Sequence, residues 1–381
     1  MSRPRLLAAS IAALAAVLVT GVLLVQRAQQ SDALSASTNA QVDWLGEVAN
    51  MAQGGFERPT TTLPVTFPQD HAVHPATPSE LWQMSAHLTG PEGAQINVQF
   101  SLTRIGLVPP DTREGDSIWE LRDLYRAHLI TTDSTGAHSI AEERFGRGLA
   151  GLAGFDDAAQ ELHFDNWAIA FPNDSQTGIW QFRATAGDVS IALDLTPEKP
   201  PLRVNADDTP FQGYAFSRLG VTGTLSTQGN ADSVAGHAWF DHAWGELPLP
   251  GAGPVISDRL LLQLDTGHDV SVVVSQRRDG RGTPSVDAFV IDRDGEISPL
   301  GGDVAQVEFP RMWQGAHVQW PVAWSIRLDD VLTLEVSAVN DAQEHSFTPA
   351  LWSGLVQAEG SFDGQPVRGT GILQLAGDRQ P

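Results

Sequence analysis

Apolar and polar residues alternate one for one along many short stretches of this chain. In residues 96–103, Ile, Val, Phe and Leu occupy every second position, and polar residues stand between them. Because successive side chains of a strand point to opposite faces, this period of two indicates a half-buried β-strand. Similar stretches recur to the end of the chain, separated by turns that 36 glycines and 24 prolines help to form. The pattern predicts an all-β protein.

The expected strands cover much of the chain beyond residue 90. They lie at residues 96–103, 125–130, 189–195, 260–264, 270–274, 286–291, 324–328, 331–336, 355–362 and 367–375. Asp363-Gly364, between the last two, predicts a tight hairpin turn. The stretch Ser139 to Leu149 is the one internal segment that favours a helix. Since strands and helices do not alternate, antiparallel barrels or sandwiches are expected, and more than about ten strands over roughly 310 residues suggest two such units.

The N-terminal segment favours a membrane anchor. Two arginines precede an apolar run from Leu6 to Val25 of about 20 residues, which is long enough to span a bilayer as a helix. We therefore expect a transmembrane signal-anchor over residues 1–25 in the inner (cytoplasmic) membrane, with the body outside, in the periplasm or the extracellular space. Cleavage near residues 33–36 would instead give a secreted protein. Residues 26–59 are expected to form a linker with a short helix over Asn39–Ala52.

Composition and missing motifs exclude several kinds of site. The chain has no cysteine, so disulfides, thiolate metal sites and thiol nucleophiles are excluded. The 46 acidic residues against 23 basic ones give a net charge of −23, which argues against nucleic-acid binding. The single lysine, Lys199, lies before two prolines, in no phosphate loop. The motifs of serine hydrolases, zincins and dehydrogenases do not occur in the sequence.

The first candidate site is the segment Phe67 to Pro75, which reads FPQDHAVHP. Asp70, His71 and His74 lie in a proline-bounded loop, where a carboxylate and two imidazoles could bind a metal or act as an acid–base pair. The alternative, which is the more common one for such clusters, is that they bond to the backbone and order the loop. Since the spacing gives no complete ligand set, no metal and no organic cofactor are expected.

The second candidate site is the segment Gly236 to Trp244. On a strand, His237, Trp239 and Asp241 share one face, and His242 belongs to the other. An aspartate beside tryptophan in a barrel interior would lose hydration, so the pKa of Asp241 would rise and it could donate a proton at neutral pH. The alternative is an aspartate that accepts backbone hydrogen bonds and orders the strand end. Spacing does not decide between the two.

These segments, in this order, resemble the lipocalin-like family that groups AttH with carotenoid 1,2-hydratase, often labelled predicted secreted hydrolases. The family pattern Phe-Pro-x-Asp-His-Gly-x-His-Pro resembles FPQDHAVHP at Phe67–Pro75. Further family blocks resemble, in order, Glu80–Met84, Asp165–Trp167, Gly236–Trp244, Ala350–Gly354 and Val367–Gly371. The resemblance covers about residues 60–378, and the two Asp-His blocks together carry most of its specificity.

The resemblance implies two packed lipocalin-like β-barrel domains, which we expect over residues 60–230 and 231–378. For the hydratases it implies water addition to a terminal double bond of an acyclic carotenoid, with an aspartate as proton donor at the position of Asp241. The other catalytic candidates are Asp70, His71, His74 and His242. The expected ligand-binding residues are Trp82, Tyr214, His237, Trp239 and Trp244.

The chain departs from the hydratase pattern at three places. Gln212-Gly213-Tyr214 stands where the hydratases have a His-x-Trp pair. Gln83 replaces the second tryptophan of the Trp-Trp pair, and Ser353 replaces the glutamate of the Trp-Glu-Gly strand. These differences indicate a changed pocket.

Three functions stay open at this point. The first, favoured by the anchor, the barrel pattern and the missing hydratase pair, is binding of an apolar lipid or isoprenoid-like molecule in a tryptophan-lined cavity, as a helper of an ABC-type exporter whose permease would be a partner. The second is a hydratase or hydrolase with Asp241 as general acid or base. The third is structural, with the Asp-His blocks locking the barrels together. Fold alone does not choose among them.

Overall fold

The computed structural model describes residues 54–59, 64–112, 121–136, 139–148, 151–203, 209–247, 255–279, 281–300, 305–316 and 318–377. The expected membrane span over residues 1–25 and the short helix over Asn39–Ala52 lie outside the described residues and stay predictions. In the part that is described, no helix has both the length and the apolar character that crossing a membrane requires. The described residues all belong to one compact unit, residues 43–381.

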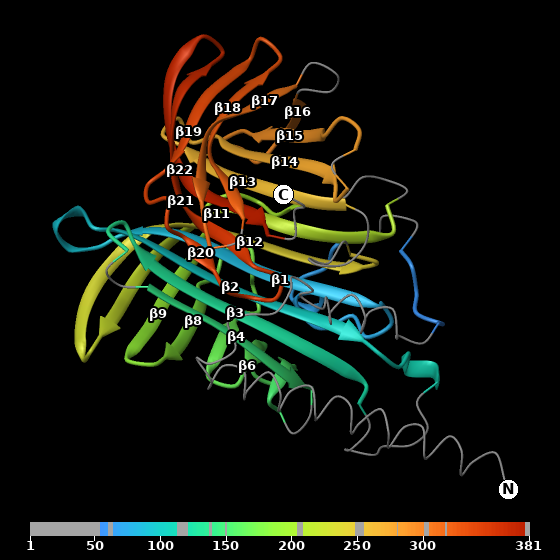
Figure 1. Cartoon of the computed structure of the whole chain (residues 1–381). Coiled ribbons are helices and arrows are strands. Elements are labelled where there is room, and N and C mark those ends of the chain that lie inside the picture. Colours follow the sequence, from blue (N-terminus) through green and yellow to red (C-terminus); the bar gives the residue numbers. More distant parts are fainter. Residues whose placement is uncertain are drawn as a thin grey trace, which may run out of the picture. The chain divides into compact units, whose positions relative to one another are not determined.

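The described elements are strands and short 3-10 helices (Figure 1). The helices are η1 (Gln69–His71), η2 (Pro91–Gly93) and η3 (Pro110–Thr112). The strands of the first sheet are β1 (Ser79–Thr89), β2 (Gln95–Gly106), β3 (Asp123–Asp133), β4 (Ser139–Arg147), β5 (Ala153–Asp156), β6 (Glu161–Phe164), β7 (Trp167–Ala170), β8 (Trp180–Ala186), β9 (Val189–Pro197), β10 (Leu202–Arg203), β11 (Phe211–Thr227) and β12 (Asn230–Gly245). Those of the second sheet are β13 (Val255–Leu264), β14 (Asp269–Arg277), β15 (Ser285–Ile291), β16 (Ile297–Leu300), β17 (Gln306–Gln314), β18 (Gln319–Leu328), β19 (Leu332–Ala338), β20 (Glu344–His345), β21 (Leu351–Phe362) and β22 (Gln365–Ala376).

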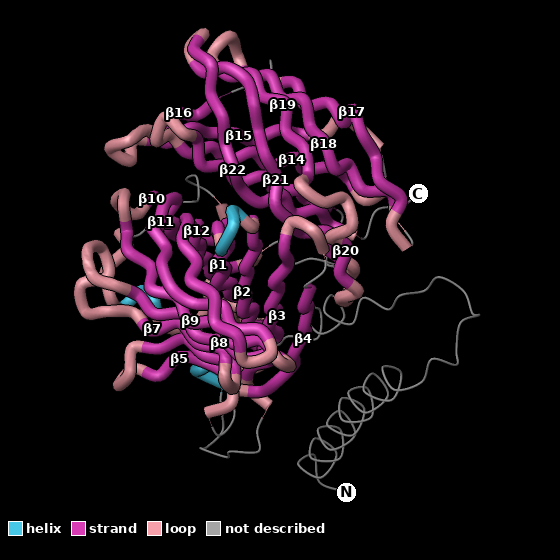
Figure 2. Tube along the Cα trace, turned by 90° about the vertical axis from the view of Figure 1, so that its left-hand side faces the viewer, coloured by secondary structure: helices cyan, strands magenta, loops and turns pink. Residues whose placement is uncertain are grey.

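All described strand pairs are antiparallel, so the all-β, antiparallel prediction is confirmed. The first sheet curls into a nearly closed barrel. Its strand order is β4-β3-β2-β1-β12-β11-β9-β8-β7-β6-β5, with β10 paired to β11 (Figure 2). The end strand β4 approaches the opposite end of the sheet near β7: Arg144 of β4 lies 3.7 Å above the ring of Trp167 in β7 and donates a hydrogen bond to Asn166.

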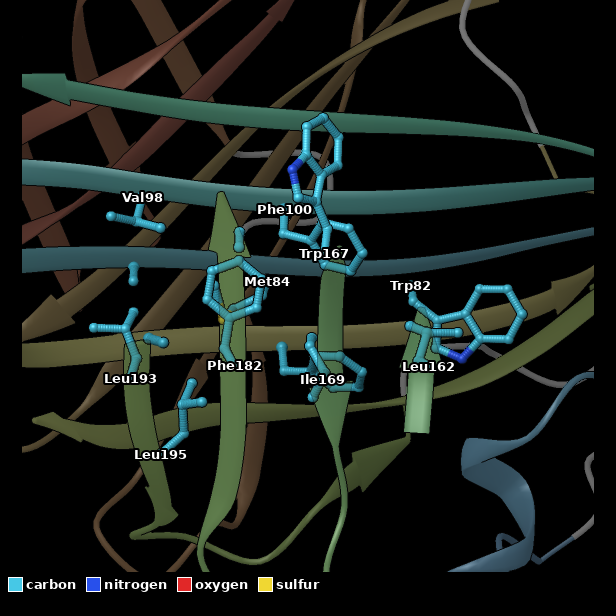
Figure 3. Packing of buried hydrophobic residues seen from close by; sticks show 14 of the residues in the cluster. Trp82, Met84, Val98, Phe100, Leu162, Trp167, Ile169, Phe182, Leu193 and Leu195 are labelled. Atoms are coloured by element: carbon cyan, nitrogen blue, oxygen red, sulfur yellow. The ribbon is translucent and has the colours of Figure 1, made fainter. Parts of the chain in front are cut away.

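Large apolar side chains fill most of this barrel. The inner residues of β1 and β2 alternate with outer ones, and Trp82 and Phe100 are almost fully buried. Phe100 packs against Trp167 and Phe182 of the opposite wall (Figure 3). Since each large apolar side chain taken out of water contributes about 1.5–3 kcal/mol, this burial stabilises the curled sheet.

The second sheet forms a half-barrel with the order β16-β15-β14-β13-β22-β21-β19-β18-β17, with β20 paired to β21. Its core contains three fully buried tryptophans: Trp320, Trp324 and Trp352. The predicted turn at Asp363-Gly364 joins β21 to β22. Both residues have positive φ, 49° and 71°, as a primed turn requires, so this hairpin prediction is confirmed.

The outer faces of β1, β2, β11 and β12 contact the second sheet. An apolar cluster lies between the two sheets, made of Leu202, Ala215, Trp239, Leu261 and Ile291. Three ion pairs flank it. Asp269 of β14 pairs with Lys199, which follows β9, and with Arg218 of β11. Asp241 of β12 pairs with Arg259 of β13.

The chain passes from the first sheet to the second between Gly245 and Val255. The expected division at residue 230 therefore falls in the hairpin between β11 and β12, inside the first sheet. The physical reason is that β12 completes the first sheet by pairing with all of β1 on one side and with β11 on the other.

The prediction of a helix over Ser139–Leu149 is wrong, because Ser139–Arg147 forms strand β4. Its backbone pairs with β3, from Thr132 opposite Ser139 to Leu124 opposite Arg147. The sequence Ala-Glu-Glu-Arg favours a helix, but that preference is weak, and tertiary pairing with a sheet edge outweighs it.

Candidate functional site

One end of the barrel interior is polar, although the rest is apolar. Four strands contribute one buried polar side chain each: Glu80 of β1, Arg104 of β2, Tyr214 of β11 and His242 of β12. The loop before β1, which contains η1, covers this end and contributes three more: Asp70, His71 and His74. We refer to these seven residues as the barrel-end cluster.

The register of the central strands brings the strand residues together. Glu80 lies opposite Arg104 in the pair β1–β2, and diagonal to His242 in the pair β1–β12. Tyr214 lies opposite His242 in the pair β11–β12. Side chains that are opposite or diagonal on one face of a sheet are within reach of each other. The alternation of four neighbouring strands thus brings four polar groups together at one end of the barrel.

Short-range hydrogen bonds shape the covering loop. The side chain of Asp70 accepts a hydrogen bond from the backbone N–H of Thr66 at 2.5 Å and lies 3.2 Å from Nε2 of His74. The turn η1 then places His71 inside the barrel, with no exposed surface. His74 lies at the rim, where 22% of its side chain is exposed.

Glu80 is the centre of the cluster. Its Oε1 lies 2.8 Å from Nδ1 of His74 and 2.9 Å from Nε2 of His242. Its Oε2 accepts hydrogen bonds from the backbone N–H of His74 at 3.0 Å and from Nε of Arg104 at 3.1 Å. Burial by itself raises the pKa of this carboxyl, but the contacts with His242 and His74 and the charge of Arg104 outweigh burial and hold the pKa well below its usual range. Glu80 is therefore a buried carboxylate.

The two imidazoles beside Glu80 differ in their pKa. Burial lowers the pKa of His74, but the hydrogen bonds with Asp70 and Glu80 outweigh burial and raise it to about 9. Burial lowers the pKa of His242, and the contact with Glu80 offsets this only in part. Neutral pH therefore leaves His74 a cation beside two carboxylates.

Arg104 ties the loop to the sheet. Its Nη2 donates to the backbone carbonyls of His74 and Thr77, both at 2.8 Å, and its Nη1 donates to Asp123 at 2.7 Å. The guanidinium has five N–H donors in one plane, so it can hold the Glu80 carboxylate and the loop backbone at once. Arg104 has no exposed surface, so these contacts are made without competing water.

A second branch of the cluster runs through Tyr214. Nδ1 of His242 lies 2.8 Å from the carbonyl oxygen of Asp70 and 3.3 Å from the hydroxyl oxygen of Tyr214. A carbonyl only accepts hydrogen bonds, so Nδ1 of His242 carries a proton. Tyr214 can then accept from His242 and donate its own proton to Nδ1 of His71, 2.5 Å away. His71 consequently carries its proton on Nε2.

The ring of His71 lies among aromatic rings. It stacks on Phe171 with centroids 3.9 Å apart and meets Trp180 edge-on at 5.3 Å. Its Nε2 is buried and has no hydrogen-bond partner among the described residues. Burial holds the pKa of His71 well below its ordinary value and the pKa of Tyr214 well above. Both side chains are therefore uncharged at neutral pH.

Three of the expected ligand-binding residues lie at this end of the barrel. Tyr214 is part of the cluster, Trp244 stacks on His74 with centroids 3.8 Å apart, and Trp82 stacks on His242 at 4.5 Å. Trp82 has no exposed surface and Trp244 almost none. These rings fill the barrel end and fix the orientation of the imidazoles, and their role in binding a ligand stays a prediction.

The remaining predicted residues lie on the outer face of β12. Asp241 accepts two hydrogen bonds from Arg259, at 2.7 and 2.8 Å, and one from Nε1 of Trp239 at 3.0 Å. His237 lines a cavity of about 260 Å³ between the two sheets. The expectation that Asp241 faces a barrel interior is wrong, because its neighbour His242 takes the inner face and side chains alternate along the strand.

One group within the cluster could hold a metal ion. The ligand atoms of His74, Glu80 and His242 all lie within 4.8 Å of one another. The set differs from the three residues considered in the sequence, Asp70, His71 and His74. His71 is turned into the barrel, where it bonds to a tyrosine hydroxyl, and Glu80 takes its place.

Sequence reasoning missed Glu80 and Arg104 as site residues, although both positions carried a signal. Arg104 continues the alternation of Ile96 to Leu102 at an inward position, where a charge needs a partner. Glu80 also points inward, on the neighbouring strand β1, two residues before the buried Trp82. Opposite charges at inward positions of neighbouring strands predict a buried ion pair.

Comparisons with known proteins cover nearly all of the described chain. A putative AttH from Nitrosomonas europaea shares the fold with a TM-score of 0.68 at 22% identity, over 84% of this chain and 99% of that chain. Kievitone hydratase from Nectria haematococca shares it with a TM-score of 0.62 at 14% identity, over 86% of this chain and 99% of that chain. None of the curated proteins matches the sequence significantly. The model of the AttH-like family matches residues 58–378, and the chain belongs to that family.

Proposed function

We propose that this AttH-like chain adds water across a carbon–carbon double bond of an apolar substrate at the barrel-end cluster. The observation that carries the proposal is Nε2 of His71, which is buried among aromatic rings and unpartnered within the described part of the chain. The hydrogen bond from Tyr214 to Nδ1 assigns the proton of this ring to Nε2. A proton donor in an apolar environment suits an apolar acceptor, since a polar substrate would lose its hydration on reaching it.

Hydrogen bonds supply a path for the proton. Nε2 of His71 gives its proton to one carbon of the double bond, while Nδ1 of the same ring takes the hydroxyl proton of Tyr214. Tyr214 in turn takes a proton from Nδ1 of His242. The His71 ring therefore stays uncharged throughout, which avoids creating a cation in the aromatic interior.

The second half of the reaction adds the oxygen. The π electrons of the double bond form the new C–H bond, and a water molecule forms the C–O bond at the other carbon. The proton that this water loses goes to Nε2 of His71, and the relay then runs back from Nδ1 of His71 through Tyr214 to Nδ1 of His242. The substrate gains one molecule of water, and His71, Tyr214 and His242 end as they began.

Access to His71 requires movement of the covering loop, because His71 and Trp82 have no exposed surface. The loop is held to the sheet by polar contacts, chiefly those of His74 with Glu80 and of Arg104 with the loop carbonyls. The relative that shares this fold and is named a kievitone hydratase gives the reason to test water addition first among acid–base reactions.

Binding of an apolar ligand without turnover is the second candidate, favoured by the same aromatic rings around His71. The membrane anchor, the location outside the cytoplasm and the exporter partner belong to that candidate and remain predictions from the sequence.

The test is a hydration assay of the purified full chain with a panel of apolar alkenes, in ordinary water and in water labelled with heavy oxygen. We expect a product that is heavier by one water and carries the label. Tyr214→Phe keeps the ring and removes the hydroxyl that links His71 to His242. Since acid–base groups contribute about 10²–10⁴-fold to rate, kcat/KM should fall by about 100-fold or more.

Tyr125→Phe is the matched control, because the chain has 2 tyrosines and Tyr125 is buried in the same core. It should leave turnover unchanged. If no alkene is hydrated and an apolar ligand binds both variants with equal affinity, the chain is a binding protein. If both variants lose turnover equally, Tyr214 does not relay a proton.

A further inference from the structure

We infer that His74, Glu80 and His242 bind a divalent transition-metal ion, for which zinc is the first choice. The three ligands come from the covering loop, β1 and β12, so the ion would join the loop to the sheet. Binding requires no turnover, and the inference stands apart from the proposed hydration.

Each of the two imidazoles lies between two acceptors. For His74, carboxylate oxygens lie at both nitrogens: Asp70 Oδ1 is 3.2 Å from Nε2, and Glu80 Oε1 is 2.8 Å from Nδ1. For His242, the carbonyl oxygen of Asp70 is 2.8 Å from Nδ1, and Glu80 Oε1 is 2.9 Å from Nε2. A neutral imidazole carries one proton and can donate to only one of its two acceptors. With both rings neutral, Nε2 of His242 would face Oε1 of Glu80 with a lone pair, and one nitrogen of His74 would face a carboxylate oxygen with another.

Positive charge between these three atoms removes the conflict. A proton on His74 lets that ring donate to both carboxylates, but Nε2 of His242 still directs its lone pair at Oε1 of Glu80. A second proton, on His242, would place two imidazolium ions beside the buried guanidinium of Arg104. A single dication supplies the positive charge with both rings neutral, because Nδ1 of His74, Nε2 of His242 and Oε1 of Glu80 then direct their lone pairs at the metal. The three ligand atoms already lie within 4.8 Å of one another. Small side-chain shifts therefore suffice to place each of them about 2.0–2.2 Å from a zinc ion between them.

The groups around the three ligands are those that a metal site needs. A metal-bound histidine commonly donates its other N–H to a carboxylate or a carbonyl, which fixes the ring. Asp70 does this for both rings, with its carboxylate at Nε2 of His74 and its backbone carbonyl at Nδ1 of His242. Arg104 holds Oε2 of Glu80, which leaves Oε1 for the metal.

Two imidazoles and one carboxylate select the class of metal. Nitrogen-rich sets suit zinc and its transition-metal neighbours, whereas magnesium and calcium prefer all-oxygen sites. Three protein ligands leave a fourth position for water, as in catalytic zinc sites, where the pKa of the bound water is about 7. Use of that water in the addition reaction rests on the proposed function, whereas the binding itself does not.

The test measures metal binding to the purified full chain after treatment with EDTA and buffer exchange, without substrate. Calorimetric titration with zinc chloride should show one site per chain, and magnesium chloride should show none. His74→Gln removes the rim ligand and should weaken zinc binding by at least about 100-fold, and Asp70→Asn, which loosens the outer contact, by about 10–100-fold.

His128→Gln is the matched control. Nε2 of His128 also contacts a glutamate, Glu143 at 2.9 Å, but the pair belongs to no group of three ligating side chains in the described part of the chain. This variant should bind zinc as the unchanged chain does. Equal zinc affinity of His74→Gln and the unchanged chain, or no zinc binding by the unchanged chain, overturns the inference.

If His74→Gln does not fold, cobalt(II) added to the unchanged chain decides the question. A site with two imidazoles should give visible absorption bands that zinc displaces, and their absence overturns the inference. The hydration assay is read separately. A chain that binds zinc and hydrates no alkene refutes the proposed function alone, and a chain that hydrates an alkene after EDTA and binds no zinc refutes the metal site alone.

Discussion

Replacing Asp241 by asparagine should weaken the contact between the two sheets and leave the chemistry of the barrel-end cluster intact. Asp241 of β12 accepts hydrogen bonds from both terminal nitrogens of Arg259 in β13, at 2.7 and 2.8 Å. The side chains of Asp241 and Arg259 keep 9% and 22% exposure. The pair therefore joins the first sheet to the second from a largely buried position.

The size of the effect follows from that burial. Removing one partner of a fully buried ion pair costs about 3–5 kcal/mol, whereas an exposed pair contributes less than about 1 kcal/mol. Arg259 retains part of its hydration, and asparagine keeps one oxygen that can accept from Trp239 or Arg259. We therefore expect the free energy of unfolding to fall by about 2 kcal/mol.

Urea unfolding followed by tryptophan fluorescence measures this change, and the hydration assay at low temperature measures turnover. Arg259→Met provides a double-mutant cycle, in which Asp241→Asn and Arg259→Met together should cost less than their sum by about 1–2 kcal/mol. Loss of turnover by about 100-fold at unchanged stability would refute this reasoning, because general acids contribute on that scale. Asp241 would then be the proton donor that the family resemblance implies.

Two other predictions concern buried charges. Arg104→Met should lower the free energy of unfolding by about 3–5 kcal/mol, because Glu80 and Asp123 each lose a cationic partner. Urea unfolding measures this loss, and a loss under about 1 kcal/mol would contradict the prediction. Burial lowers the pKa of His128 to about 4 from 6.5, so between these values the unfolded chain binds a proton that the folded chain does not. The stability that depends on neutral His128 is therefore complete above pH 6.5 and declines toward pH 4, by about 3 kcal/mol at most. The free energy of unfolding, plotted against pH over that range, should have a smaller slope for His128→Gln than for the unchanged chain. Equal slopes would count against the prediction.

The alternation of apolar and polar residues correctly predicted the strands that bury every second residue in a core. Residues 96–103, 189–195 and 367–375 lie within β2, β9 and β22, and each of these strands buries its alternate apolar residues. Strand β4 was missed because none of its residues is fully buried. A strand at a sheet edge with two partly exposed faces shows no period of two, so composition alone suggested a helix.

The site was predicted in part, and β12 shows why the prediction stopped there. The sequence placed Asp241 and His242 on opposite faces correctly. From Ala238 to Gly245 both faces of β12 are buried, one in the barrel and the other against the second sheet, so hydropathy could not tell which face was the interior. The contact between Glu80 and His242 joins residues 162 apart in the chain, and only the pairing of β1 with β12 produces it.

A bound metal and a proton relay are compatible on His242, because they use different nitrogens. Nε2 faces Glu80, whereas Nδ1 faces the carbonyl oxygen of Asp70 and the hydroxyl of Tyr214. A dication on Nε2 withdraws electron density from the ring and makes the Nδ1 proton easier to lose, which favours its transfer to Tyr214. The two proposals together therefore require that Tyr214→Phe lower turnover at any zinc concentration and leave zinc affinity unchanged. A loss of zinc affinity in that variant would mean that the hydroxyl positions the ring of His242 for the metal instead of carrying its proton.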